Sequence, residues 1–212
     1  MADRSALEGR RLYLCTPDRP DLEAFVNACI AGGVDVVQLR EKHLDARPLL
    51  ARAEVAARVC RRHHVPFILN DRPDLALEVG ADGVHVGQDD APPALARRIL
   101  GHAAVVGFST HAPRELDAAL HEPVDYVSVG PVSETPTKPG RAGTGIDYVR
   151  YARDHAHVPF FVTGGVTPET IPAYAAAGAT RFVVVRYLTE AADPLAAARR
   201  LRQAIDSALP RQ

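Results

Sequence analysis

The sequence lacks tryptophan, has one methionine and three cysteines, and carries a formal net charge of −1 over 212 residues. Cys15, Cys29 and Cys60 are odd in number and widely spaced, so they match neither a disulfide framework nor a zinc site. A charge balance so close to zero provides no basic surface for nucleic acid or an anionic membrane. We therefore expect no nucleic-acid partner and a reducing compartment, the cytoplasm.

Long apolar runs are also missing from this sequence. No stretch approaches the ~20 apolar residues needed to cross a bilayer, and the first residues, MADRSALEGRR, lack the apolar core of a signal peptide. The hydrophobic fraction of 47% is nevertheless ordinary for a globular chain and sufficient for a large core. Because no linker or break in composition is visible, we predict one domain over residues 1–212, with no membrane partner.

Short apolar segments alternate with helical patterns along the sequence. The predicted strands are Leu12–Cys15, Val34–Leu39, Val65–Leu69, Gly83–Val86, Ala104–Phe108, Tyr126–Val129, Pro159–Thr163 and Arg181–Val185. The predicted helices are Asp21–Ala31, Arg47–Arg62, Asp74–Val79, Pro93–Leu100, Pro113–Leu120, Ile146–His155, Pro168–Ala177 and Pro194–Ala208. Four of these helices begin near a proline, which is typical of a first helical turn.

The alternation predicts the fold class, a (β/α)8 TIM barrel in the α/β class, with a doubly wound open sheet as the alternative. The type of repeating unit does not change along the chain, and this constancy favours the barrel. Glycine recurs between a helix and the next strand, at Gly32-Gly33, Gly80 and Gly178, where it can end the helix in a left-handed conformation. In such barrels the active site lies at the carboxyl ends of the strands. Polar residues at those ends are therefore the site candidates.

The stretch Val36–Lys42 starts as an apolar run and ends in Gln38, Arg40 and Lys42. Alternate residues of a strand share one face, so an amide and two cations converge at the end of this strand. Arginine offers a planar fork and lysine a point charge, which together suit an anion. The alternative is a set of solvated side chains with no ligand.

Two carboxylates, Asp71 and Asp90, follow neighbouring strands of the predicted barrel. Close to a polyanion site, such a pair suggests Mg²⁺, which binds through few carboxylates together with substrate phosphates. Either aspartate could instead cap the next helix, and Asp89 could exchange roles with Asp90.

Two later segments also suit phosphate. The long loop over residues 130–143 contains Thr135, Thr137 and Lys138, and is either a lid or a flexible surface loop. Gly164-Gly165, placed before a predicted helix, can offer backbone N–H groups to a phosphate. Arg186 at the end of the last strand adds a charged donor. His85 and His111 lie near these candidates, and we expect structural or supporting roles for them.

Five motifs occur in order along nearly the whole sequence: Gln38-x-Arg40-x-Lys42, Asn70-Asp71, Asp82-Gly83-Val84-His85-x-Gly87-Gln88-x-Asp90, Gly130-Pro131-x3-Thr135-x-Thr137-Lys138 and Gly164-Gly165. This ordered set resembles the thiamine-phosphate synthase family. The resemblance implies a TIM barrel that joins 4-amino-2-methyl-5-hydroxymethylpyrimidine pyrophosphate to 4-methyl-5-(2-phosphoethyl)thiazole. The products would be thiamine phosphate and pyrophosphate.

The resemblance also implies a role for each matching residue. On the pyrimidine pyrophosphate it places Gln38, Arg40, Lys42, Asn70, Ser109 and Lys138, of which Lys42, Ser109 and Lys138 are the catalytic candidates. On the thiazole phosphate side it places Thr135, Thr137 and Gly165. Gly164, Val185 and Arg186 are further substrate-binding candidates. It assigns Mg²⁺ to Asp71 and Asp90 as the cofactor. The family often has serine where this sequence has Arg186, and a guanidinium could replace that hydroxyl.

Three other functions stay open at this point. A thiazole tautomerase or regulator of similar fold would bind a thiazole phosphate, but would not need Asp71, Asp90, Lys42 and Lys138. A sugar-phosphate isomerase or epimerase barrel would need a catalytic acid–base pair. A catalytically silent ligand-binding protein would differ only by its lack of turnover. The expected partners are small-molecule substrates, and the sequence leaves a homo-oligomer open.

Overall fold

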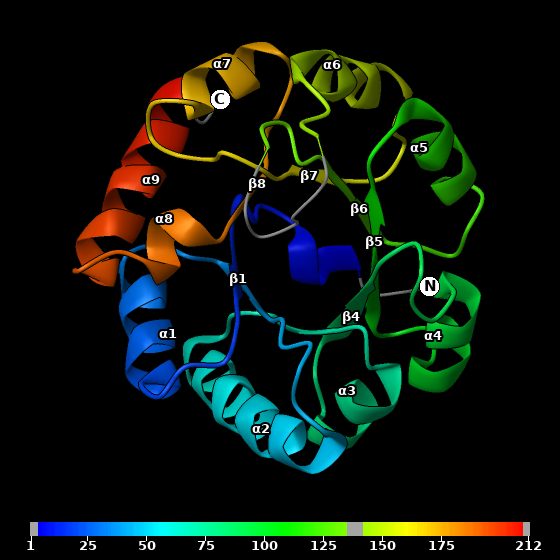
Figure 1. Cartoon of the computed structure of the whole chain (residues 1–212), viewed down its shortest axis with the longest axis vertical. Helices are drawn as coiled ribbons and strands as arrows, with labels where there is room; N and C mark the ends of the chain where they lie inside the picture. The colour runs from blue at the N-terminus through cyan, green and yellow to red at the C-terminus, as the bar shows by residue number, and fades with distance from the viewer. Residues whose placement is uncertain (1–3, 135–141, 210–212) are drawn as a thin grey trace.

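The computed structural model describes residues 4–134 and 142–209, and it shows eight parallel strands closed into a barrel inside a ring of helices (Figure 1). The strands are β1 (Leu12–Thr16), β2 (Val36–Leu39), β3 (Phe67–Asn70), β4 (Gly83–Val86), β5 (Val105–Thr110), β6 (Tyr126–Val129), β7 (Phe160–Val162) and β8 (Phe182–Val184). Each strand pairs with the next, and β8 closes the barrel by pairing with β1. The predicted fold class is confirmed.

The helices lie outside the barrel and cover the outward faces of the strands (Figure 1). They are α1 (Leu22–Ala31), α2 (Ala46–His63), α3 (Pro73–Val79), α4 (Pro93–Leu100), α5 (Pro113–Ala119), α6 (Ile146–His155), α7 (Ile171–Ala176), α8 (Arg186–Thr189) and α9 (Pro194–Ala208). Outward residues such as Val37, Leu39 and Leu69 are fully buried beneath them. Both faces of each strand are therefore covered, which explains why the strands read as short apolar runs instead of alternating patterns.

The inside of the barrel has its own apolar cluster, at the amino-terminal ends of the strands. It consists of Leu7, Tyr13, Val36, Ile68, Val105, Tyr126 and Phe161. Leu7 comes from a short 3₁₀ helix, η1 (Arg4–Leu7), which lies at the centre of the ring in Figure 1 and was not predicted. This segment covers the end of the barrel opposite the carboxyl ends of the strands.

Most element boundaries differ from the predicted ones by one to three residues, and two differences affect the site. Strand β8 ends at Val184, so Arg186 begins the short helix α8 and does not end the strand. Helix α7 begins at Ile171, so Pro168 precedes it. There the Thr170 hydroxyl donates to Gly165 O, which holds a turn before the helix starts. The predicted left-handed helix end is confirmed at Gly80, which follows α3 with φ of 63°.

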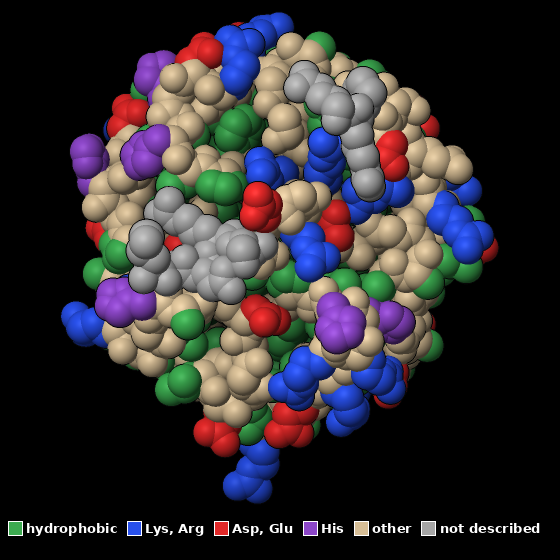
Figure 2. All heavy atoms as spheres, turned by 180° about the vertical axis from the view of Figure 1, so that it is seen from behind, with side chains coloured by type: hydrophobic (Ala, Val, Ile, Leu, Met, Phe, Trp, Pro, Cys, Tyr) green, Lys and Arg blue, Asp and Glu red, His purple; other side chains and the backbone are tan. Residues whose placement is uncertain are grey.

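The surface carries charges of both signs. On the face seen from behind in Figure 2, acidic, basic and histidine side chains are interspersed with small hydrophobic groups. This mixture agrees with the net charge of −1. Within residues 4–134 and 142–209, no helix has both the length and the apolar character required to cross a membrane.

Candidate active site

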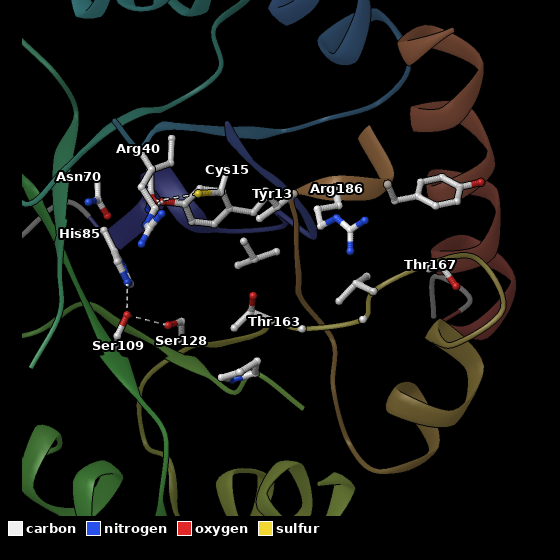
Figure 3. Close-up of a pocket in the computed structure, with 18 of the residues that line it drawn as sticks. Tyr13, Cys15, Arg40, Asn70, His85, Ser109, Ser128, Thr163, Thr167 and Arg186 are labelled. Carbon is white, nitrogen blue, oxygen red and sulfur yellow. Dashed lines mark hydrogen bonds between the residues drawn. The ribbon is translucent and has the colours of Figure 1, made fainter. Parts of the chain in front are cut away.

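A cavity of about 480 Å³ opens at the carboxyl ends of the strands (Figure 3). The strands and the residues directly after them supply Tyr13, Cys15, Gln38, Arg40, Asn70, His85, Ser109, Tyr126, Ser128, Pro131, Thr163, Gly164, Gly165, Val183 and Val185. The loops and helices that follow supply Glu134, Val166, Thr167, Arg186, Tyr187, Glu190, Ala191 and Arg200. All eight strands or their ends therefore contribute to one hollow.

Eight of the predicted site residues line this cavity: Gln38, Arg40, Asn70, Ser109, Gly164, Gly165, Val185 and Arg186. They lie in β2, β3 and β5 or in the segments that directly follow β2, β7 and β8, so the fold brings together residues that are far apart in sequence. Thr135, Thr137, Lys138 and most of the predicted lid lie outside the described residues. The chemical roles of all these residues stay predictions.

Lys42, Asp71 and Asp90 form a charged cluster next to the ends of β2, β3 and β4. Lys42 Nζ lies 2.8 Å from Asp71 Oδ2 and 3.9 Å from Asp90 Oδ1. The helix-cap alternative is wrong for both aspartates, because the cap positions of α3 and α4 are Arg72 and Pro92. Asp90 instead accepts a hydrogen bond from the backbone N–H of Gly87 at 2.9 Å. This hydrogen bond and the short distance to Lys42 distinguish Asp90 from Asp89, which is exposed.

The backbone conformation of Asp71 and the negative charge of its carboxylate are both energetically unfavourable in this cluster. It has φ of 62°, a left-handed conformation in which a residue other than glycine is uncommon. Burial raises the pKa of its carboxyl, and the nearby Asp90 carboxylate raises it further, although Lys42 opposes both effects. A backbone strain and an unfavourable charge at the same residue are typical of functional sites.

The cluster fits a divalent cation that takes most of its ligands from elsewhere. The Lys42 ammonium stands between two carboxylates as a single positive charge. Among the described residues, no group of three or more His, Cys, Asp and Glu side chains could enclose a metal by itself. Two carboxylates with remaining positions filled by phosphate oxygens and water are the usual arrangement for Mg²⁺.

The opposite side of the cavity has the features of a phosphate corner. Gly164 and Gly165 both have positive φ, and a Cβ on Gly164 would lie only 2.5 Å from Pro131 Cβ. Glycine is therefore required for this close turn beside the cavity. Arg186 and Glu190 also line the cavity. They form a two-point ion pair, with Nε–Oε1 at 2.7 Å and a second contact at 3.1 Å.

Arg200 adds a second guanidinium to this corner. It reaches the cavity from α9, and its Nε donates to the hydroxyl of Tyr187 at 3.1 Å. Neither Arg200 nor Tyr187 was predicted as a site residue. The sequence around Arg200 indicates only a helix, and Tyr187 lies in the segment that leads to this helix. Their position depends on how α8 and α9 pack, which local sequence does not indicate.

The floor of the cavity is polar, and most of the residues that form it were not predicted from the sequence. Tyr13, Cys15, Tyr126 and Ser128 line it and are buried. The available signal was their spacing: each pair stands two residues apart in a strand and so shares one face. His85 was expected to be structural or supporting. It lines the same floor, with Nε2 2.9 Å from Ser109 Oγ.

The other predicted histidine lies apart from this floor. His111 hydrogen-bonds through Nδ1 to Glu115 at 2.9 Å. Glu115 also accepts from the backbone N–H of His111. Both bonds hold the start of α5, which fits the structural role expected of His111.

The fold and the cavity together define a class of protein. It is a TIM-barrel enzyme with a glycine–arginine corner in the cavity at the carboxyl ends of its strands. A carboxylate–lysine cluster lies after β2, β3 and β4, outside the lining of that cavity. Such a site suits small molecules that carry phosphate groups.

The chain belongs to the thiamine monophosphate synthase family, whose model matches residues 12–188. It is 50% identical over 211 residues to the thiamine-phosphate synthase of Thermobifida fusca, covering 97% of this chain and 96% of that protein. It is 51% identical over 199 residues to the thiamine-phosphate synthase of Thermus thermophilus, covering 91% and 96%. The solved structure of thiamine phosphate pyrophosphorylase from Pyrococcus furiosus superposes with a TM-score of 0.87 at 26% identity, covering 97% and 98%.

Proposed function

We propose that this cavity carries out the reaction of the family with the residue roles given below. As a member of that family, the chain is a transferase. It joins 4-amino-2-methyl-5-hydroxymethylpyrimidine pyrophosphate to 4-methyl-5-(2-phosphoethyl)thiazole, and releases thiamine phosphate and pyrophosphate. One observation carries the assignment of roles: two separate groups of charged residues lie across one barrel. The charged cluster follows β2, β3 and β4, and the phosphate corner follows β7 and β8.

The pyrimidine pyrophosphate binds on the β2–β4 side in this proposal. Gln38, Arg40 and Asn70 line that side of the cavity. Asn70 is only 5% exposed, and its Nδ2 is buried with no hydrogen-bond partner among the described residues. A buried donor without a partner costs about 1–3 kcal/mol, so a ligand acceptor at this point would remove that cost. Lys138 is assigned to the same substrate on the family resemblance alone.

Mg²⁺ is the proposed cofactor, held by Asp71 and Asp90 beside Lys42. When bound, it would neutralise charge on the pyrophosphate. The carboxylates would supply two of its oxygen ligands. Lys42, which lies beside both carboxylates, would supply a further positive charge to the phosphate oxygens.

The reaction itself needs no general base. The bond between the pyrimidine methylene carbon and the pyrophosphate oxygen breaks, and the electron pair leaves with the pyrophosphate. The resulting methylene cation is stabilised by the aminopyrimidine ring. The lone pair of the thiazole nitrogen then forms the new C–N bond, and this nitrogen has no proton to lose. Lys42, Ser109 and Lys138 would face the developing negative charge, so electrostatics and positioning supply the rate.

The thiazole phosphate binds on the β7–β8 side. The turn at Gly164-Gly165 brings the backbone close to the cavity, Val185 lines its wall, and Arg186 offers a guanidinium. Thr135 and Thr137 are placed on this substrate by the resemblance. A phosphate dianion would compete with Glu190 for Arg186, because both are anions that a guanidinium binds at two points.

The cytoplasm is the proposed location, and small molecules are the proposed partners. Cys29 and Cys60 are buried thiols in the described structure, and burial raises the pKa of each to about 12. Such thiols are inert and suit a reducing compartment. Self-association of the chain stays a proposal.

Incubation of the purified protein with both substrates and Mg²⁺ tests the function. We expect equimolar thiamine phosphate and pyrophosphate, measured by chromatography and a coupled pyrophosphate assay. Omitting either substrate should abolish both products. Binding of the thiazole phosphate without any turnover in the complete mixture would overturn the proposal in favour of a tautomerase-like or binding protein.

A further inference from the structure

One continuous line of hydrogen bonds crosses the floor of the cavity. Figure 3 shows its end, where His85, Ser109 and Ser128 meet. It starts at Cys15, whose Sγ lies 3.2 Å from Gln38 Oε1. Gln38 Nε2 lies 2.8 Å from the Tyr13 hydroxyl, which lies 2.9 Å from the Tyr126 hydroxyl. These residues come from β1, β2 and β6, so the line runs across the barrel and not along a strand.

The line continues to the candidate catalytic serine. Tyr126 hydroxyl lies 2.9 Å from His85 Nδ1, and His85 Nε2 lies 2.9 Å from Ser109 Oγ. The Ser128 hydroxyl approaches Ser109 Oγ at 3.4 Å as a further donor. Gly107 makes room for this arrangement, since a Cβ there would lie 2.1 Å from Cζ of the Tyr126 ring.

The chemistry of Gln38 sets the direction of every bond that follows. An amide nitrogen can only donate, so the Tyr13 oxygen accepts from Gln38. The buried Tyr13 proton is then directed at Tyr126, the other hydrogen-bond partner of this hydroxyl in the described residues. The Tyr126 proton then goes to His85 Nδ1. His85 consequently carries its ring proton on Nε2 and donates it to Ser109.

The opposite direction would leave the buried Tyr13 proton without an acceptor, or would require a reversed amide at Gln38. Its N–H would then face Cys15 Sγ, and sulfur is a weak acceptor for an amide N–H. In the observed orientation the thiol can donate to Oε1 instead. Burial also raises the pKa of both Tyr13 and Tyr126, so each phenol keeps the proton that the chain requires.

We propose that this line of hydrogen bonds holds His85 as the neutral Nε2–H tautomer and leaves the Ser109 proton directed into the cavity. Tyr13, Tyr126 and His85 are then positioning residues, each acting through the next one. Ser109 accepts from His85, so its own O–H is available to a ligand. This inference builds on the proposed function, in which Ser109 faces the pyrophosphate.

The direction matters because the two possibilities have opposite effects on an anion. With Nε2–H, Ser109 donates to the pyrophosphate oxygens, where negative charge grows as the C–O bond breaks. With Nδ1–H, Ser109 would donate to His85, and its lone pairs would face the same oxygens. A hydrogen-bond donor would become a source of repulsion without any change of residue.

NMR of the ligand-free protein labelled with ¹⁵N-histidine tests the tautomer directly. We expect the His85 ring, assigned by comparison with the His85→Gln spectrum, to show a proton on Nε2 and none on Nδ1. In Tyr126→Phe, Nδ1 loses its donor, so the ring should become a mixture of tautomers. A proton on Nδ1 in the unsubstituted protein, or an unchanged ring in Tyr126→Phe, would overturn the proposal.

Kinetics separate positioning from simple loss of structure. Tyr126→Phe should lower kcat by roughly 10- to 100-fold, the scale of one hydrogen bond to a charged group. The thiazole KM should stay within about twofold, because that substrate binds elsewhere. Tyr148→Phe is the matched control, since it removes another buried hydroxyl, bonded to Thr110 at 2.7 Å, outside this line. An equal loss of kcat in both variants would indicate a structural effect only.

A double substitution identifies the route of the effect. Glutamine at position 85 keeps an N–H donor for Ser109 but has no tautomers, so Tyr126→Phe should have little further effect on kcat in His85→Gln. Additive losses would mean that Tyr126 acts independently of His85. The NMR result also separates this inference from the proposed function, because a correct tautomer in a protein that forms no thiamine phosphate would overturn only the latter.

Discussion

The two ends of the barrel interior are built by the same strands but serve different purposes. On the inward face of β2, Val36 is followed by Gln38, and on β3, Ile68 is followed by Asn70. The first residue of each pair belongs to the apolar cluster, and the second lines the cavity. One step of the pleat, about 7 Å, therefore separates residues that stabilise the fold from residues available to a substrate.

Two tyrosines join these regions. The rings of Tyr13 and Tyr126 pack edge-on against Phe161, each with a centroid distance of 5.3 Å, and belong to the apolar cluster. Their hydroxyl groups belong to the polar floor. An aromatic ring with a polar tip suits such a boundary, because it can be buried on one side and hydrogen-bonded on the other. Substitutions on each side of this boundary should thus affect different measurements.

The largest expected effect lies on the polar side, at the charged cluster. Asp71→Asn and Asp90→Asn should each lower kcat/KM by roughly 10²–10³, because each removes a charged ligand for Mg²⁺. Asp89→Asn is the neighbouring control and should stay close to the unsubstituted protein. Steady-state rates across a Mg²⁺ titration measure this effect. Full activity in EDTA, or in both cluster variants, would contradict the metal assignment.

The next prediction compares two residues on one face of β3. Ile68→Ala should lower the free energy of unfolding by about 2–5 kcal/mol, as expected for a cavity in a fully buried site. Asn70→Ala should lower kcat/KM by roughly 10². It should leave stability unchanged or slightly higher, because it removes a buried donor without a partner. Urea unfolding and steady-state kinetics on both variants measure the two effects. A similar loss of stability in both would show that the boundary is not sharp.

The sequence predicts those parts of the apolar cluster and the polar cavity that depend on neighbouring residues, and not those that depend on contacts between distant residues. Gln38 and Arg40 were found because residue type changes on one strand face within a few positions. Asp71 and Asp90 were found because neighbouring strands end side by side. The Tyr13–Tyr126 contact joins residues 113 positions apart, and tyrosine in a strand usually indicates only core packing. Helix α8 has four residues, too few for a helical pattern, so Arg186 was placed on the strand.

A smaller effect is expected at the phosphate corner, where Arg186 is half-exposed. Arg186→Ala should raise the thiazole phosphate KM roughly tenfold, the lower end for a charged hydrogen bond, and leave the pyrimidine KM nearly unaltered. Arg186→Ser should recover part of the loss. Glu190→Gln should lower the same KM by removing the anion that competes for Arg186. Arg199→Ala, at an exposed arginine of α9, is the control. An unchanged KM in Arg186→Ala would make Arg186 a surface arginine.

The smallest expected effect concerns stability and not rate, and it again lies at Asp71. Folding raises the pKa of this carboxyl, chiefly through burial. The folded state therefore binds the proton more tightly than the unfolded chain. The contribution of Asp71 to stability thus falls as the pH rises through the interval between the ordinary and the raised pKa, and the cost persists at neutral pH. Asparagine removes this charge and tolerates the left-handed backbone at φ of 62°.

Asp71→Asn should accordingly raise the melting temperature of the ligand-free protein at pH 7, and the gain should shrink as the pH falls and Asp71 becomes protonated. Asp74→Asn is a control of opposite sign, because the ion pair with Arg72 lowers the pKa of Asp74. That substitution should destabilise slightly at pH 7, with the loss disappearing at low pH. Thermal unfolding in EDTA between pH 3 and 7 measures both. Destabilisation of the protein at pH 7 by Asp71→Asn would contradict this prediction. It would mean that the attraction of Asp71 to Lys42 outweighs the cost of burying its carboxylate, so that the polar end of the barrel does not lower stability.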